Sequence, residues 1–389
     1  MSEHESHLWV DTDAGLADLV EKLRAEPEIA LDTEFHREKS FFPEVAVVQL
    51  GWNGGVAVVD ALALDPSPLA ALLGAGTLVV MHAATQDIEV LQQICGTIPE
   101  RLFDTQIAAG FCGYATPSLT SLLHGELGVI LPKGDRLTDW LRRPLAADQR
   151  EYAAADVANL LPLADRLRDR LRESGRQRWA EDECEELRRR GLQGRDPSES
   201  WWRVKEARSL RGKAVGVAQA LGAWREQRAA RVNQPVRFVL PDLALVGIAQ
   251  KPPPDAEGLR RVRGLDDRHL RNGASAEILE AVREGLSLPK ESLRLPPASD
   301  VDRDLRPAVT LVSAWVSQLS RELGIDTSLV ATRSDLEALL RGDPDARLAH
   351  GWRAATIGHA IRALVGGEAA LAFNGKGGLV LEQRSRKPV

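Results

Sequence analysis

Runs of apolar residues that are typical of buried strands concentrate near the beginning of this chain, which limits what it can fold into. Four such segments occupy residues 29–35, 45–50, 56–59 and 78–81, and the first of them runs from Ile-Ala-Leu into Asp-Thr-Glu-Phe. Turn residues Asn-Gly-Gly at 53–55 separate the second run from the third and predict a β-hairpin. Helical periodicity is found at residues 68–73, 85–94, 104–128 and 146–172. Strands that first cluster and then alternate with helices predict a mixed α/β sheet with helices on its faces.

The second half of the chain differs, because helical periodicity continues after residue 200 with almost no strand-like runs. Two segments have the composition of domain boundaries: Gly-Arg-Asp-Pro-Ser-Glu-Ser at 194–200 and Leu-Pro-Pro-Ala-Ser-Asp at 295–300. We therefore predict one or two all-α domains behind the α/β domain. The expected limits are 1–175 for the α/β domain, 176–204 for a helical linker, 205–290 for the first helical domain, 291–304 for a second linker and 305–389 for the second helical domain.

The two helical segments resemble a diverged repeat. A shift of 91 positions brings apolar residues of the first segment onto apolar residues of the second. The matched pairs are Leu221 with Val312, Trp224 with Trp315, Phe238 with Leu329, Leu245 with Leu336, and Ile248 with Leu339. Any two amphipathic helix pairs can be aligned somewhere, but the matched tryptophans favour a duplicated module.

Charge is divided unevenly along the chain. The net charge is −6, yet residues 1–175 carry −13 and the remainder carries +7. A protein that binds metal cations in one part and a polyanion in another could have this distribution. An acidic domain beside a neutral one would give the same numbers, so the charge alone leaves both interpretations open.

Composition favours a cytoplasmic protein that does not enter a membrane. The three cysteines, Cys95, Cys112 and Cys184, are too few and too scattered for a disulfide framework or a CxxC zinc site. No apolar run has the length of a membrane span. The polar, acidic N-terminus lacks the basic flank and apolar core of a signal peptide.

Asp32 and Glu34 close the first strand-like run in the sequence Asp-Thr-Glu. Alternation along a strand places both carboxylates on one face. Two adjacent buried carboxylates repel each other unless a cation lies between them. A turn with two solvated acids is the alternative, and it is the better interpretation of this tripeptide taken alone.

A second motif joins the end of a strand to the start of a helix. His82 follows the run at 78–81, and Asp87 lies in the first turn of a helix that is expected to begin near Thr85. Acids are favoured in that turn by the helix dipole, so Asp87 could serve only the helix. The third motif is Tyr152-Ala-Ala-Ala-Asp156, in which the phenol and the carboxylate share one helix face. A Tyr–Asp hydrogen bond on a surface helix is the alternative there.

The order and chemistry of these motifs together resemble the DEDD superfamily of 3′-5′ exonucleases, in the subtype with a tyrosine in the third motif. Within it the chain is most similar to the ribonuclease D family. The resemblance covers residues 28–172 and includes Arg-Leu-Phe-Asp-Thr-Gln at 101–106 and Asp-Trp-Leu-Arg-Arg-Pro-Leu at 139–145. The helical half resembles the helicase-and-RNase-D C-terminal (HRDC) domain, clearly in its first segment and weakly in its second.

The resemblance implies a ribonuclease-H-like fold and a site for two divalent ions. Carboxylate oxygens without a His/Cys set select Mg²⁺ or Mn²⁺ rather than zinc. Asp32 is expected to bridge both ions, Glu34 and Asp156 to complete the shell of the water-activating ion, and Asp87 to support the other ion. A phenol has an ordinary pKa of about 10, so Tyr152 is expected to orient the attacking water.

Further residues near the motifs could bind nucleic acid. Phe35 could stack on the terminal base, although a core phenylalanine is at least as good an interpretation. His82 could contact the terminal nucleotide, but a histidine at the end of a strand is more often structural. The basic residues before the third motif, which could hold phosphates or form an exposed loop balanced by acids, are Lys133, Arg136, Arg142 and Arg143.

An arginine-rich segment in the first helical domain is a candidate for RNA-backbone binding. It surrounds Gly264 and contains Arg260, Arg261, Arg263, Arg268 and Arg271. Within it, Arg261 and Arg263 are the chosen candidates. A solvated helix face would have a similar composition.

Taken together, the residues and the resemblance predict a 3′-5′ exoribonuclease. The resemblance implies release of nucleoside 5′-monophosphates from the 3′ ends of tRNA precursors or other structured RNAs, with no obligate protein partner. A DNA-preferring exonuclease is the nearest alternative, because proofreading nucleases use the same acids. A non-catalytic RNA-binding scaffold would not need all four acids, which are present here.

Overall fold

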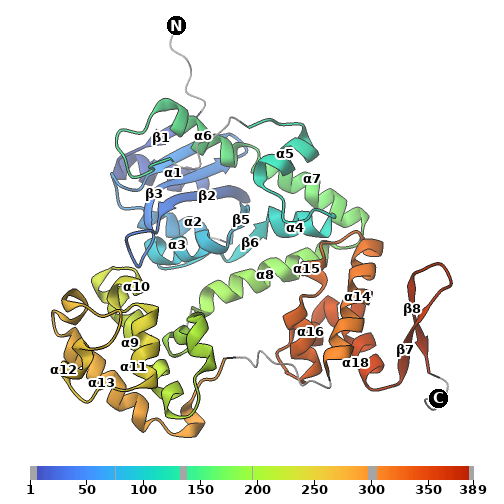
Figure 1. Ribbon diagram of the computed structural model, residues 1–389. Helices are drawn as coiled ribbons and strands as arrows, with labels where there is room; N and C mark the ends of the chain where they lie inside the picture. Colours follow the sequence, from blue (N-terminus) through green and yellow to red (C-terminus); the bar gives the residue numbers. More distant parts are fainter. Residues whose placement is uncertain (1–6, 75, 132–137, 195, 297–304, 385–389) are drawn as a thin grey trace. The chain divides into compact units, whose positions relative to one another are not determined.

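A computed structural model describes residues 7–74, 76–131, 138–194, 196–296 and 305–384 (Figure 1). The chain divides into two compact units. Unit 1 contains Met1–Glu34, Val47–Leu192 and Asp300–Val389, and unit 2 contains Phe35–Ala46 and Gln193–Ser299. None of the helices in the described part of the chain is long and apolar enough to cross a membrane.

A six-stranded mixed sheet forms the centre of unit 1, in the order β1-β4-β3-β2-β5-β6. The strands are β1 (Leu8–Val10), β2 (Glu28–His36), β3 (Glu44–Trp52), β4 (Gly55–Asp60), β5 (Leu78–Met81) and β6 (Arg101–Asp104). β3 and β4 form an antiparallel hairpin at the predicted Asn-Gly turn, whereas β1–β4, β2–β5 and β5–β6 are parallel pairs. The four predicted strands are therefore confirmed, and the short strands β1 and β6 are added to them.

Helices cover the sheet, as the α/β prediction required. They are α1 (Asp13–Leu23), α2 (Ala70–Leu73), α3 (Thr85–Cys95), α4 (Thr105–Phe111), α5 (Leu119–Leu127), α6 (Ala147–Ala158) and α7 (Leu160–Glu173). In α7, Leu163, Leu167 and Leu171 recur every four residues and are all buried. This spacing places them on one face of the helix, which explains why the segment folds against a core.

The charged segment that was expected to be a helical linker contains the long helix α8 (Gln177–Gln193). Only Ala180 and Cys184 of this helix are buried. Its exposed surface is stabilised locally by Arg–Glu pairs one turn apart, such as Arg188 with Glu185.

The C-terminal part of unit 1 is mainly helical. It contains α14 (Arg306–Leu323), α15 (Thr327–Val330), α16 (Arg333–Leu340), α17 (Gly351–Arg353) and α18 (His359–Val365). Its core is continuous with that of the α/β domain, because the Trp352 ring lies 5.3 Å from the ring of Phe111 and stacks at 4.7 Å on Trp179 of α8.

An antiparallel hairpin follows α18 and departs from the all-helical expectation for residues 305–389. It consists of β7 (Ala369–Phe373) and β8 (Leu379–Gln383). The cause is local, because the turn between the strands contains Asn374 and three glycines, of which Gly375 and Gly377 adopt positive φ angles.

Unit 2 contains a separate helical module, as the predicted HRDC-like domain required. Its helices are α9 (Lys213–Val232), α10 (Val236–Val239), α11 (Asp242–Gln250), α12 (Ala256–Arg260) and α13 (Ala274–Ser287). α9 and α13 touch backbone to backbone: a Cβ on Gly216 would lie 2.3 Å from the carbonyl oxygen of Gly285. The module has its own core, which includes Trp201, Leu221 and Leu245.

The predicted repeat is visible in the helix boundaries. α15 begins 91 positions after α10, and α16 begins 91 positions after α11. Leu245 and Leu336, which the alignment matched, are both buried in their modules. The matched pair Phe238 and Leu329 is less alike, because Phe238 is half exposed at 52% and Leu329 is partly buried.

Candidate active site

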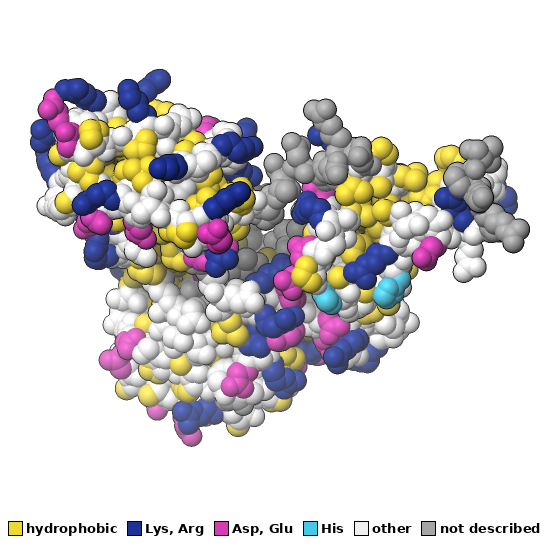
Figure 2. Space-filling view, turned by 90° about the horizontal axis from the view of Figure 1, so that it is seen from below, with side chains coloured by type: hydrophobic (Ala, Val, Ile, Leu, Met, Phe, Trp, Pro, Cys, Tyr) yellow, Lys and Arg dark blue, Asp and Glu magenta, His cyan; other side chains and the backbone are white. Residues whose placement is uncertain are grey.

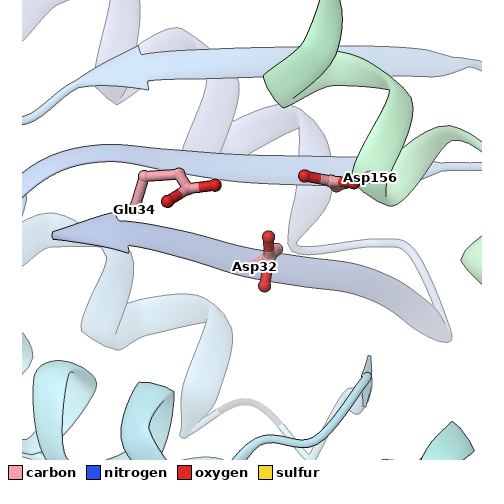
Figure 3. Close-up of side chains that lie close together, drawn as sticks. All are labelled: Asp32, Glu34 and Asp156. Carbon is pink, nitrogen blue, oxygen red and sulfur yellow. The ribbon is translucent and has the colours of Figure 1, made fainter. Parts of the chain in front are cut away.

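β2 carries the first pair of predicted acids near its carboxyl end. Asp32 and Glu34 project from the same side of the strand, as their spacing requires (Figure 3). β2 pairs with β5 as far as Ala30 and Val80, and β5 ends at Met81. Both acids therefore lie at the edge where β2 continues past its neighbour, and helices from elsewhere in the chain can approach them.

α6 brings the third motif against the same face of the sheet. Asp156 is buried together with Ala153 and Val157. This close approach needs Gly51 of β3, because a Cβ at that position would lie only 2.9 Å from the carbonyl oxygen of Val157. Tyr152, one turn before Asp156, is half-buried beside Trp140, with ring centroids 6.2 Å apart.

Three of the predicted acids meet in space. One carboxylate oxygen from each of Asp32, Glu34 and Asp156 lies within 4.8 Å of the others. Figure 3 shows the three carboxylates converging from β2 and α6. Residues more than 120 positions apart in the sequence thus form one cluster.

Burial and mutual repulsion make these carboxyl groups hard to ionise. Burial, followed by the charges of Asp87, Asp156 and Glu34, raises the pKa of Asp32 well above its usual value. Burial and the charges of Asp156 and Asp87 raise the pKa of Glu34 to about 8. Burial raises the pKa of Asp156 to about 7. A bound cation would favour the ionised form of every one of these groups.

Asp87 lies in the first turn of α3 and is buried. Its Oδ1 accepts a hydrogen bond of 2.5 Å from the Thr33 hydroxyl, so the middle residue of the Asp-Thr-Glu motif holds the second motif in place. Burial raises the pKa of Asp87 to about 6, although the Thr33 hydrogen bond acts in the opposite direction. The Thr33 hydrogen bond holds Asp87 next to the strand that carries Asp32 and Glu34. The charge of Asp87 raises the pKa of both of these acids.

Asp104, in the Arg-Leu-Phe-Asp-Thr-Gln segment, organises the backbone that leads to Asp87. Its carboxylate accepts hydrogen bonds from the amides of Ala83 and Ala84 before α3, and from those of Gln106 and Ile107 at the start of α4. The turn it holds includes Ala83 at φ +58°. Sequence patterns assigned no role to this acid, because capping contacts between two helices depend on their tertiary arrangement.

The cluster fits divalent cations that prefer oxygen ligands. The four acids supply only carboxylate oxygens, and none of them forms an ion pair with Lys, Arg or His in the described part of the chain. Buried carboxylates without a cationic partner are costly, and metal coordination is the usual compensation. Oxygen-only donor sets match Mg²⁺ and Mn²⁺.

Phe35 and His82, the two residues next to the acids that were predicted to contact nucleic acid, lie in different environments. Phe35 is half-buried directly after Glu34, which is compatible with either of its predicted roles. His82 Nδ1 lies 2.9 Å from the Thr105 hydroxyl, and burial lowers the pKa of His82. His82 Nε2, by contrast, is buried without a hydrogen-bond partner among the described residues, so both interpretations of His82 stay open.

Arg143 is bound within the protein. Its guanidinium donates two hydrogen bonds to Asp60, of 2.8 and 2.6 Å, and one to the carbonyl oxygen of Trp140. A guanidinium held in this way by a carboxylate with only 6% of its side chain exposed fixes the loop before α6. Phosphate binding by Arg143 stays a prediction that would have to compete with this ion pair. Of its predicted neighbours, Arg142 is exposed, whereas Lys133 and Arg136 lie outside the described residues.

The arginine-rich segment of unit 2 is at the surface. Arg261 and Arg263 are exposed, and Arg261 pairs with Glu257 one turn away on α12. On the face drawn in Figure 2, Lys and Arg side chains are interspersed with Asp and Glu. These positions are accessible to a polyanion, and their use for RNA stays a prediction.

Comparison with known proteins identifies an exonuclease segment followed by an HRDC segment. Residues 8–172 match the 3′-5′ exonuclease family, and residues 215–282 match the HRDC domain. The chain is 36% identical to ribonuclease D of Acidiphilium cryptum over 378 residues, covering 94% of this chain and 95% of that protein. It is 37% identical to ribonuclease D of Granulibacter bethesdensis over 369 residues, covering 93% of each. The crystal structure of Escherichia coli RNase D superimposes with a TM-score of 0.83 at 31% identity, covering 93% of this chain and 99% of that one.

Proposed function

This chain belongs to the ribonuclease D family of 3′-5′ exoribonucleases, and on that premise we propose that it shortens structured RNAs from their 3′ ends by two-metal-ion hydrolysis. The products would be nucleoside 5′-monophosphates, and tRNA precursors are the expected substrates. The similar Escherichia coli enzyme is an exoribonuclease involved in structured RNA processing, which supports this substrate class.

One observation carries the proposal. Asp32, Glu34 and Asp156 bring carboxylate oxygens within 4.8 Å of one another in a setting that resists their ionisation. Such a cluster destabilises the protein unless cations are bound there. Two bound divalent ions would supply a water of lowered pKa and would neutralise charge on the leaving 3′ oxygen.

The side chains of this protein divide the remaining work. Asp32, whose pKa is raised by burial and by the charges of the other three acids, would bind both ions. Glu34 and Asp156 would hold the ion that carries the attacking water, and Asp87 would support the other ion. Tyr152 would accept or donate a hydrogen bond that orients this water, since it lies on the same helix as Asp156 one turn away.

The metal mechanism is tested with Asp156→Asn and a matched control on the same helix. Asp156→Asn should abolish cleavage of an end-labelled tRNA precursor in Mg²⁺ or Mn²⁺ while RNA binding persists. Asp148→Asn changes an exposed acid in the first turn of α6 and should leave the rate unchanged. Chelator should stop the wild-type enzyme. Full activity of Asp156→Asn, or of the wild type in excess chelator, would refute the mechanism.

The role of Tyr152 is tested by Tyr152→Phe, which removes only the hydroxyl group. Loss of an orienting hydrogen bond should lower the rate of hydrolysis by about 10²-fold with little change in RNA affinity. Single-turnover cleavage and filter binding measure the two effects separately. An unchanged single-turnover rate would contradict the water-orienting role of Tyr152.

Preference for DNA is the alternative function, because the same acids would hydrolyse either polymer. RNA and DNA substrates of one sequence, assayed in parallel, distinguish the two. An RNA enzyme is expected to contact 2′-hydroxyl groups and should therefore cleave the RNA faster. Faster cleavage of the DNA would replace the proposed substrate while leaving the metal mechanism intact.

A further inference from the structure

Gln49 is a buried amide without a partner. This residue of β3 is 0% exposed, and neither its Nε2 nor its Oε1 has a hydrogen-bond partner among the described residues. Burying an amide without hydrogen bonds costs about 1–3 kcal/mol. Because buried side-chain amides are normally satisfied, a group of this kind calls for a binding partner that the polypeptide alone does not supply.

The face on which Gln49 lies follows from its neighbours. Gly51 faces α6, because a Cβ there would lie 2.9 Å from the Val157 carbonyl oxygen and 3.2 Å from the Ala30 Cβ. Side chains alternate along a strand. Gln49, two residues before Gly51, therefore lies on the α6 side of the sheet, as does Asp32, two residues after Ala30.

The register of the two strands brings these residues together. β2 and β3 are neighbours joined by only seven residues, which requires an antiparallel pair. Since Ala30 faces Gly51, the residue opposite Asp32 is Gln49. Opposite side chains of such a pair have Cβ atoms about 4.5–5.5 Å apart, which an amide and a carboxylate can bridge. In Figure 3 the strand next to β2 on the Asp156 side is β3.

We propose that Gln49 is a positioning residue of the metal site, whose Nε2 donates a hydrogen bond to the Asp32 carboxylate when that group is ionised and binds the cations. The hydrogen bond would use a carboxylate lone pair that the cations do not take, and it would fix the orientation of Asp32. Groups that orient metal ligands in this way typically change metal affinity or activity by about 10- to 100-fold. The inference rests on the proposed metal-dependent function.

Gln49→Met tests the proposal, because methionine has a similar volume and no hydrogen-bonding amide. Mn²⁺ binding to the RNA-free protein, measured by calorimetry or electron paramagnetic resonance, should weaken about tenfold or more. The turnover number should fall with it, while the Michaelis constant for RNA should not change. The melting temperature without metal should stay the same or rise, since an unpartnered polar group has been removed from the core.

Gln219→Met is the matched control. Gln219 is also buried, but its amide is satisfied: Nε2 donates to the Ser292 carbonyl oxygen at 3.1 Å, and Oε1 accepts from the Arg294 amide at 2.7 Å. This substitution should lower the melting temperature and leave Mn²⁺ affinity unchanged.

The outcomes separate this inference from the proposed function. If the wild type binds Mn²⁺ and Gln49→Met binds it equally well, the positioning role is wrong while the metal site stands. If Gln49→Met melts lower without a change in Mn²⁺ affinity, Gln49 serves the core, for example through a buried water, and the inference is again overturned. If the wild type itself binds no Mn²⁺, the proposed function fails first.

Discussion

Each of the two helical modules begins with three helices in corresponding order, but the helices of the two modules pack against different parts of the protein. α9, α10 and α11 belong to unit 2, where their apolar residues form a core of their own. α14, α15 and α16 belong to unit 1, where they share one core with α4, α7 and α8 of the exonuclease domain. If the two modules arose by duplication, one has kept a core of its own and the other has joined the core of the exonuclease domain.

In each module two arginines bind one glutamate, but this glutamate belongs to the module itself only in unit 2. Glu183 of α8 binds Arg353 and Arg347 of the C-terminal module, with 12% of its side chain exposed. Glu277 binds Arg228 and Arg231 within the first module, with 33% exposed. The first network joins two parts of unit 1 and is largely buried. Its loss should therefore lower the free energy of unfolding more than loss of the second network.

Truncation should give the largest effect. A chain ending at residue 296 lacks the C-terminal module and exposes apolar residues of α4 and α8, including Phe111 and Trp179. We expect it to aggregate or to lose the cooperative unfolding transition of the exonuclease domain, as measured by size-exclusion chromatography and calorimetry. A chain ending at residue 384 is the control. A truncated protein with the unchanged exonuclease transition would show that the shared core is dispensable.

The substitution Trp352→Ala should have the second-largest effect on stability. The ring contacts Phe111 and Trp179, is 7% exposed, and its loss leaves a cavity in the shared core. The free energy of unfolding should fall by about 3–5 kcal/mol. Arg261, which stands 91 positions earlier in the first module, is exposed, so Arg261→Ala should change stability by less than about 0.5 kcal/mol. Urea unfolding of both variants measures the contrast, and equal losses would contradict it.

Glu183→Gln should destabilise unit 1 by about 3 kcal/mol, because it leaves two arginines without a counter-charge in a largely buried setting. Glu277→Gln should cost less than about 1 kcal/mol, since its network is partly exposed. Chemical denaturation under one set of conditions compares them directly. A larger loss in Glu277→Gln would reverse the ranking of the two interfaces.

The Glu183 network should also depend on pH. Burial alone would raise the pKa of Glu183, but the hydrogen bond and charge of Arg353, together with the charge of Arg347, hold this pKa below its usual value. A carboxyl pKa that is lower in the folded state stabilises the protein above the unfolded pKa of about 4.3. The stability difference between wild type and Glu183→Gln should therefore be constant above that pH and shrink as the pH falls. A difference that grows on acidification would contradict the assignment.

Local patterns predict the strands and the three acidic motifs, because alternation and helical spacing depend on neighbouring residues. Contacts between distant segments are not predicted in this way. Thr33 stands between two acids as a spacer in the sequence, although its hydroxyl binds Asp87. A basic residue near a motif suggests an anion site, but the guanidinium of Arg143 is bound by Asp60, 83 positions earlier. A role for Gln49 can be inferred only once its burial and the register of its strand are known.

The smallest expected effect concerns the segment between β2 and β3, which belongs to unit 2 and is bound there by Asn233. The amides of Phe41 and Phe42 both donate to Asn233 Oδ1 at 3.1 Å, and Asn233 ends α9 at φ +46°. Asn233→Gly removes the acceptor but keeps the backbone conformation, which glycine adopts without strain. Global stability should change by less than about 1 kcal/mol, while hydrogen exchange of these two amides should become faster. Because the C-terminal module is held through buried contacts, its amides should be unaffected; faster exchange there would show that the two modules are coupled rather than separate.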